Sequence, residues 1–182
     1  RHIASWNGAS WSPLGSGAVS LGVVEVMTVF DDGSGGGPAL YAGGRLTYAG
    51  SARANNIAKW DGAAWSALGS GLIGLSGEVL AIAVFDDGSG GGPALYAGGS
   101  FTNAGGVAAN NIAKWDGAAW SPLGSGVNSR VDALTVYDDG SGSALYAGGS
   151  FEIAGGVAAN RIAKWDGVAW SPLVSGVLSR GR

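Results

Sequence analysis

Residues 112–126 read IAKWDGAAWSPLGSG, and close copies of this stretch begin at Ile3, Ile57 and Ile162. The three copies read IASWNGASWSPLGSG, IAKWDGAAWSALGSG and IAKWDGVAWSPLVSG, and the four stretches together contain all eight tryptophans. Self-similarity at a nearly fixed period is the signature of a repeat protein. We therefore predict a chain built from repeated units, each with one tryptophan stretch.

Each tryptophan stretch has the pattern of a β-hairpin. A short run, IAKW, is followed by Asp-Gly or Asn-Gly and then by a second run, AAWSPL. Asp-Gly and Asn-Gly tolerate the positive φ angles of a two-residue type I′ turn. With Asp116 and Gly117 as the loop, Trp115 would pair with Ala118. Trp115 and Trp120 would then lie on one face as diagonal neighbours, and we expect both to be largely buried.

Two further strand signals precede each of the last three tryptophan stretches. The first is a run rich in β-branched and aromatic residues, at 24–30, 79–85 and 131–137. The second contains Leu-Tyr-Ala-Gly-Gly, at 39–46, 94–101 and 144–151. Each period of 50 to 55 residues thus holds four strands. This predicts an all-β fold, a β-propeller of four-stranded blades. An all-β solenoid is the alternative, although its repeats are usually much shorter.

Counting the strand signals predicts an incomplete ring. Its parts would be an N-terminal half blade at 1–17, complete blades at 18–71, 72–126 and 127–176, and the start of a linker at 177–182. A propeller closes with about four to eight blades, so this chain alone should stay open. Open ends would expose apolar faces and strand edges. We therefore expect the Trp6/Trp11 and Trp165/Trp170 regions to meet protein, either further copies of the chain or another subunit.

The stretches ALYAGGSF at 94–101 and NNIAKWDGAAWSPLGSG at 110–126 carry a resemblance. They are similar to the kelch-like repeats of bacterial secreted proteins and of the fungal cortical-marker family of bud-site proteins. The resemblance covers nearly the whole chain and implies a β-propeller, usually in an extracellular or cell-surface setting. It implies no shared catalytic motif, and fold analogy alone does not give a function.

The amino-acid composition favours a globular fold and argues against several kinds of function. The chain of 182 residues is 46% hydrophobic and 13% charged, which favours a globular fold. It contains no cysteine, which excludes disulfides, thiol catalysis and cysteine-ligated metal. A net charge of −3, with three lysines all in the Lys-Trp position, offers no basic surface for nucleic acid. No segment approaches the roughly 20 apolar residues of a membrane helix, so we expect no membrane span.

Three Asp-Asp-Gly-Ser-Gly turns are the candidate metal loops. Their acidic residues are Asp31, Asp32, Asp86, Asp87, Asp138 and Asp139. Calcium takes six to eight oxygen ligands, usually from carboxylates at alternating positions, whereas these carboxylates are adjacent and followed by glycine. We interpret the loops as turns, with calcium binding as the alternative, and expect no metal or cofactor.

The tryptophan pairs are the candidate ligand platform. Large aromatic side chains usually supply packing energy, so we interpret the pairs first as contacts between blades. If their faces look outward, Trp65 and Trp120 are the best candidates for stacking against a sugar.

Catalytic groups are sparse. The one histidine, His2, has no carboxylate beside it, and no serine has a base at a recurring position. The glutamates Glu25, Glu78 and Glu152 occupy non-equivalent places in the repeat. We therefore expect no enzymatic activity. The leading hypothesis is a non-catalytic propeller scaffold or protein-interaction module; the alternative is a carbohydrate-binding, lectin-like propeller.

Overall fold

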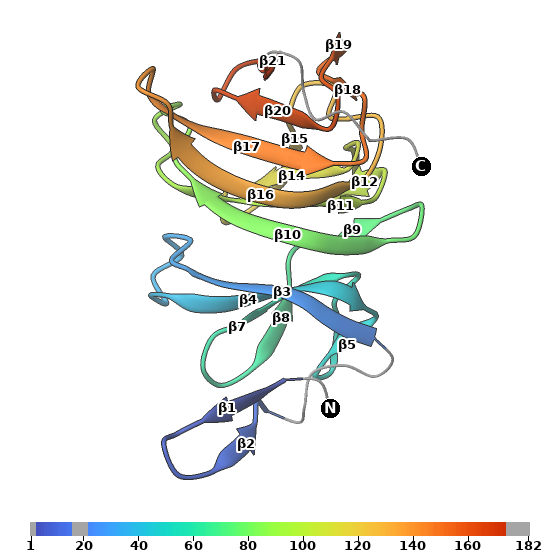
Figure 1. Cartoon of the computed structure of the whole chain (residues 1–182). Coiled ribbons are helices and arrows are strands. Elements are labelled where there is room, and N and C mark those ends of the chain that lie inside the picture. Colours follow the sequence, from blue (N-terminus) through green and yellow to red (C-terminus); the bar gives the residue numbers. More distant parts are fainter. Residues whose placement is uncertain (1–2, 16–21, 174–182) are drawn as a thin grey trace.

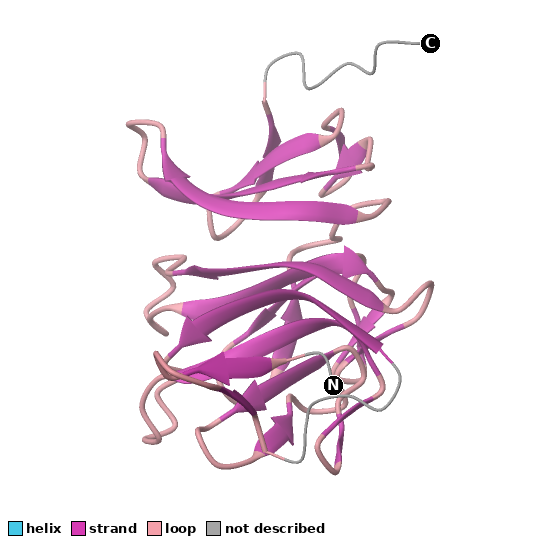
Figure 2. Cartoon of the chain, turned by 60° about the horizontal axis from the view of Figure 1, so that its bottom comes forward, coloured by secondary structure: helices cyan, strands magenta, loops and turns pink. Residues whose placement is uncertain are grey.

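The computed structural model describes residues 3–15 and 22–173 (Figure 1). Every regular element in these two ranges is a β-strand, and all the strand pairs are antiparallel (Figure 2). The predicted all-β class is confirmed. Within the described ranges, nothing forms a helix of the length and apolarity that crossing a membrane would take.

Three four-stranded sheets share one plan, in which the strands lie side by side in chain order. The first sheet consists of β3 (Gly22–Phe30), β4 (Ala39–Leu46), β7 (Ile57–Trp60) and β8 (Trp65–Ala67). The second consists of β10 (Glu78–Phe85), β11 (Ala94–Ser100), β14 (Ile112–Trp115) and β15 (Trp120–Pro122). The third consists of β16 (Val131–Asp138), β17 (Ser143–Gly149), β20 (Ile162–Trp165) and β21 (Trp170–Pro172). The predicted order of the four strand signals is confirmed.

Short strands complete the fold. The first tryptophan hairpin pairs β1 (Ala4–Trp6) with β2 (Trp11–Pro13). Two-residue strands form in the stretch before each later hairpin, where the sequence predicted only loops. They are β5 (Tyr48–Ala49), β6 (Ala52–Arg53), β12 (Asn103–Ala104), β13 (Val107–Ala108), β18 (Ile153–Ala154) and β19 (Val157–Ala158), and β9 (Leu72–Ile73) pairs with β12. Two residues are too few to show the period-2 alternation by which a strand is recognised.

The predicted register of the tryptophan hairpins is wrong. Trp115 pairs directly with Trp120, so the loop between them is four residues long rather than two. The cause is the Asp116 carboxylate, which accepts the N–H groups of Ala118 at 2.9 Å and Ala119 at 2.7 Å. An aspartate that binds the backbone two and three residues on stabilises this wider loop. The predicted shared face and burial of the two tryptophans are confirmed.

Consecutive sheets pack against each other in chain order, with the β1–β2 hairpin at the bottom of Figure 1 and the last sheet at the top. Side chains alternate along a strand, so each sheet has two different faces. The tyrosine face of the first sheet consists of Phe30, Tyr41, Ile57 and the adjoining Leu68. The tryptophan face of the second sheet consists of Leu95, Ala97, Trp115 and Trp120. The two faces meet in one buried cluster.

The same contact occurs at the other two junctions. The tyrosine face of the second sheet (Phe85, Tyr96, Ile112, Leu123) meets the tryptophan face of the third (Leu145, Ala147, Trp165, Trp170). In the β1–β2 hairpin, Ile3 and Leu14 meet the tryptophan face of the first sheet (Leu40, Ala42, Trp60, Trp65). Both junctions between sheets therefore join a tyrosine face to the tryptophan face of the next sheet, and the first hairpin, which has no tyrosine, contributes Ile3 and Leu14 instead.

Glycines permit two close backbone approaches. A Cβ on Gly43 would lie 2.6 Å from a methyl group of Val79 in the next sheet, so this glycine sets the distance between sheets. A Cβ on Gly99 would lie 2.0 Å from the carbonyl oxygen of Glu78 in the paired strand, next to a β-bulge at Val79 and Ala81. A bulge next to a glycine is a common way to bend a strand.

We expect Gly99→Ala to destabilise the fold by about 1–3 kcal/mol, the usual cost of overpacking a site that cannot relax. Gly91→Ala is the matched control, because Gly91 has no atom within 4 Å of an added Cβ and its φ is not positive. That control should change stability by less than about 1 kcal/mol. Urea unfolding measures both variants, and equal midpoints would contradict the role assigned to Gly99.

Candidate functional site

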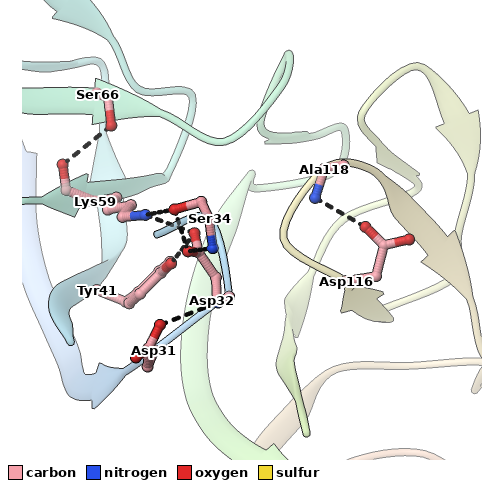
Figure 3. A network of polar contacts seen from close by, with 9 residues as sticks. Asp31, Asp32, Ser34, Tyr41, Lys59, Ser66, Asp116 and Ala118 are labelled. Atoms are coloured by element: carbon pink, nitrogen blue, oxygen red, sulfur yellow. Dashed lines mark hydrogen bonds and ion pairs between the residues drawn. The ribbon is translucent and has the colours of Figure 1, made fainter. Parts of the chain in front are cut away.

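A polar cluster stands at one end of each sheet. In the first sheet, Asp32 Oδ2 accepts hydrogen bonds from Tyr41 OH at 2.7 Å and Lys59 Nζ at 2.6 Å (Figure 3). The Lys59 ammonium also lies 5.9 Å from the centre of the Tyr41 ring, within cation–π range. Asp32 lies in the loop after β3, Tyr41 on β4 and Lys59 on β7. The cluster therefore ties the loop to two strands.

The same cluster recurs in the other two sheets. Its members there are Asp87, Tyr96 and Lys114, and Asp139, Tyr146 and Lys164. The sequence pattern identified the aspartates as candidate metal ligands, but their lysine and tyrosine partners were not predicted. A signal was present, because each lysine follows its aspartate by 27, 27 and 25 residues in the three repeats.

These contacts set the protonation of the cluster. Burial by itself raises the pKa of Asp32, but hydrogen bonds from Lys59, Ser34 and Tyr41 outweigh it and hold that pKa well below its usual range. Burial and the neighbouring Asp32 carboxylate raise the pKa of Tyr41 far above its usual range. Asp87 and Tyr96 shift in the same directions for the same reasons. Each carboxylate is therefore ionised and each phenol neutral at ordinary pH.

The Asp-Asp-Gly stretches form turns in the structure. The first aspartate of each, at Asp31, Asp86 and Asp138, accepts the N–H of the glycine two residues on, at 2.8–3.0 Å. The second aspartate is engaged by the lysine and tyrosine of the cluster. Within residues 3–15 and 22–173, no three acidic or histidine side chains gather as a metal site would require. Calcium binding there would have to displace a lysine ammonium.

We expect stability to fall on acidification through these clusters. A folded-state pKa below the unfolded value of about 3.9 contributes stability that is complete above that value and is lost as pH falls toward the folded pKa. Asp87→Asn should therefore lower the free energy of unfolding at pH 7 by about 1–3 kcal/mol, since it removes hydrogen bonds to a charged group. It should also make the loss between pH 4 and pH 2 shallower than in the wild type. Parallel acid slopes in urea unfolding would contradict this.

The tryptophan hairpin of one sheet binds the backbone of the preceding unit. Trp120 Nε1 donates to the Leu68 carbonyl at 2.9 Å, and Trp170 Nε1 donates to the Leu123 carbonyl at 3.0 Å. Trp65 Nε1 makes the equivalent bond to the Leu14 carbonyl at 3.3 Å. Every junction between units thus carries one such hydrogen bond.

The hairpin loop makes a second backbone contact. A Cβ on Gly117 would lie 2.6 Å from the carbonyl oxygen of Asp32, and one on Gly167 would lie 2.5 Å from that of Asp87. The loops of the last two hairpins therefore rest on the Asp-Asp-Gly turn of the preceding sheet. Figure 3 labels Asp31 and Asp32 of the turn, and Asp116 and Ala118 of the hairpin loop.

The predicted ligand platform is covered. Trp65 and Trp120 are 8% and 6% exposed, and each packs on its own hairpin partner and on the preceding unit. The exposed pair is instead Trp6 and Trp11, at 52% and 70%. These two rings lie 5.4 Å apart, as in the buried pairs, but no described residue covers their tryptophan face.

The other open surface is the tyrosine face of the third sheet. Its Tyr137 is 60% exposed, whereas Phe85 at the same place in the second sheet is 3% exposed. The face forms an open pocket of about 530 Å³ lined by Thr135, Tyr137, Asp139, Tyr146, Ile162, Lys164, Pro172 and Leu173. Trp165 and Trp170 lie on the opposite side and are buried against the second sheet. The expectation that they form an open end is therefore wrong.

The candidate catalytic residues are not gathered in one place. Glu25 and Glu78 both approach the exposed Arg45, at 3.6 and 4.0 Å. Glu152 lies on the surface near the third sheet, and His2 lies outside the described residues. Arg45, Glu25 and Glu78 form an ion-pair group between the first and second sheets.

We expect the two tryptophans of one repeat position to differ in their effect on stability. Trp120→Ala should cost about 3–5 kcal/mol, because it leaves a cavity between two sheets. Trp11→Ala, at the equivalent but exposed position, should cost less than about 0.5 kcal/mol. Thermal and urea unfolding at submicromolar concentration measure both. A Trp120→Ala variant as stable as the wild type would contradict the packing role.

Comparison of the chain with protein-family models, with curated proteins and with solved structures finds no match.

Proposed function

We propose that the chain is a non-catalytic β-propeller scaffold, a protein-interaction module of an extracellular, cell-surface or periplasmic assembly. The observation that carries this proposal is the pair of open apolar faces, around Trp11 at one end and Tyr137 at the other. Contiguous exposed apolar surface on a soluble protein usually marks an interaction site. Both faces are of the kind that other units of the same chain bury.

The propeller architecture is supported by the repeat of one four-stranded plan. The three sheets have the same strand order, and each packs on the next through the same two faces. Propeller blades are four-stranded sheets that pack radially in this way. The resemblance of residues 94–126 to kelch-like repeats supports the same architecture and the extracellular setting.

Interaction rather than catalysis fits the placement of the charged groups. The lysines and aspartates of the three clusters are engaged with one another and with a tyrosine, and they tie loops to strands. General acid–base work needs a group whose pKa lies near the working pH. The aspartate and tyrosine of these clusters have pKa values moved away from neutrality.

The proposal is tested by hydroxyl-radical footprinting of the chain, first alone at nanomolar concentration and then in the material from which it is isolated. Trp11 and Tyr137 should be labelled in the isolated chain and protected in the assembly. Val168 is 83% exposed on a hairpin loop and serves as the internal control that stays reactive in both. Equal labelling of Trp11 and Tyr137 in the two samples would contradict the scaffold proposal.

Carbohydrate binding is the second candidate, and one observation favours it. The exposed Trp6 and Trp11 rings, tilted by 46°, offer aromatic surface of the kind that stacks on sugars. This moves the platform from Trp65 and Trp120 to the first hairpin. A glycan array probed with the wild type and Trp11→Ala tests it: sugar binding that Trp11→Ala abolishes, with folding unchanged, would favour the lectin over the scaffold.

A further inference from the structure

The two open faces of the described chain are complementary halves of one interface. Inside the chain, the tyrosine faces of the first and second sheets each meet the tryptophan face of the next sheet. The first hairpin leaves a tryptophan surface uncovered, and the third sheet leaves a tyrosine face uncovered. One unpaired surface of each kind remains, so two copies could pair them without any new type of contact.

The hydrogen-bonding groups at the two ends match in the same way. At each interior junction, a tryptophan Nε1 donates to the carbonyl of a leucine that follows Ser-Pro or Ser-Ala. Within the described residues, Trp11 Nε1 has no acceptor, and Leu173 is the one such leucine without a tryptophan donor. Leu173 also lines the open pocket of the third sheet.

The loop contacts leave a second matching pair. Gly117 and Gly167 rest on the carbonyls of Asp32 and Asp87, while the turn at Asp139 receives no such loop from the described chain. Gly8, the corresponding glycine of the first hairpin, has nothing within 4 Å of an added Cβ, and its φ of +98° is close to the +100° of Gly117. The first hairpin loop therefore has the same backbone conformation at this glycine as the loop at Gly117, which contacts the preceding turn.

The glycine that faces the next sheet, at Gly43, Gly98 and Gly148, gives an independent indication that the third sheet can accept another unit. A Cβ on Gly43 or Gly98 would lie 2.6 Å from a valine of the next sheet. At Gly148, the same position in the third sheet, the nearest atoms would be 4.0 Å away. The third sheet thus has the same glycine as the interior sheets, although no valine of a following sheet lies against it in the described chain.

We propose that copies of this chain associate head to tail, with the Trp6–Trp11 hairpin of one copy docked on the tyrosine face of the third sheet of another. Trp11 Nε1 would donate to the Leu173 carbonyl of the neighbouring copy, and Gly8 would rest on its Asp139 turn. This names the partner of the proposed scaffold and rests on that function. A heterologous contact of this kind generates rings or filaments.

Two single variants and their mixture test the direction of the contact. Sedimentation velocity at 1–100 μM should show association for the wild type, and monomers for Trp11→Asp and for Leu173→Asp. A 1:1 mixture of the two variants should form a dimer that does not grow, because it holds one intact hairpin and one intact tyrosine face. Val168→Asp, at an exposed site outside both surfaces, should associate like the wild type.

Each alternative outcome is decisive. A wild type that stays monomeric at 100 μM overturns the proposal, as does a mixture that stays monomeric. A Leu173→Asp variant that still dimerises would show that like ends pair with each other, which also overturns it. If copies do not associate but footprinting still finds Trp11 protected in the native assembly, the partner is another protein and the scaffold proposal stands alone.

Discussion

The packing of a tryptophan face on the tyrosine face of the preceding unit is the contact on which the rest of the structure depends. Short, glycine-rich sheets of three to nine residues per strand bury little surface by themselves. At each junction, paired tryptophans fill the space between sheets, and a glycine such as Gly43 lets a valine of the next sheet approach closely. A single unit therefore buries too little surface to be stable without a neighbour, as expected for repeat architectures.

The Asp–Tyr–Lys clusters support this contact by holding a turn in place rather than by their own interaction energy. Exposed ion pairs contribute little stability, and even buried ones are partly offset by desolvation. The clusters of the first two sheets instead fix the Asp-Asp-Gly turns on which the loops at Gly117 and Gly167 rest. The neighbour in turn shields the cluster: the Asp87 side chain is 6% exposed beneath a following sheet, whereas that of Asp139 is 39% exposed at the open end. Polar and apolar parts of the junction thus support each other.

Periodicity allowed the sequence to predict the all-β class and the order of the four strands, because both follow from short repeating patterns. The hairpin register was missed, since Asp-Gly suits a two-residue turn and only the structure shows the Asp116 carboxylate binding the amides of Ala118 and Ala119. The lysine partner of Asp32 was missed because 27 residues separate the two in sequence.

Which face of the last sheet stays open could not be derived from the sequence either. A repeat reads the same at each unit, so the pattern does not tell whether the tryptophans of a unit pack on the unit before it or after it. The structure fixes the direction: Trp170 binds Leu123 of the preceding unit. The open end of the third sheet is therefore its tyrosine face, with Tyr137, and the open end of the first hairpin carries Trp6 and Trp11.

The third unit also differs from the others in a way that suits an open end. Tyr137 stands where the first two sheets have Phe30 and Phe85, which are both buried. A tyrosine presents an apolar ring and a hydroxyl that water can bind, and such residues are enriched at interfaces. A phenylalanine at this exposed position could form no such hydrogen bond with water. The hydroxyl therefore lowers the cost of exposing this face while keeping an aromatic ring where the interior sheets have one.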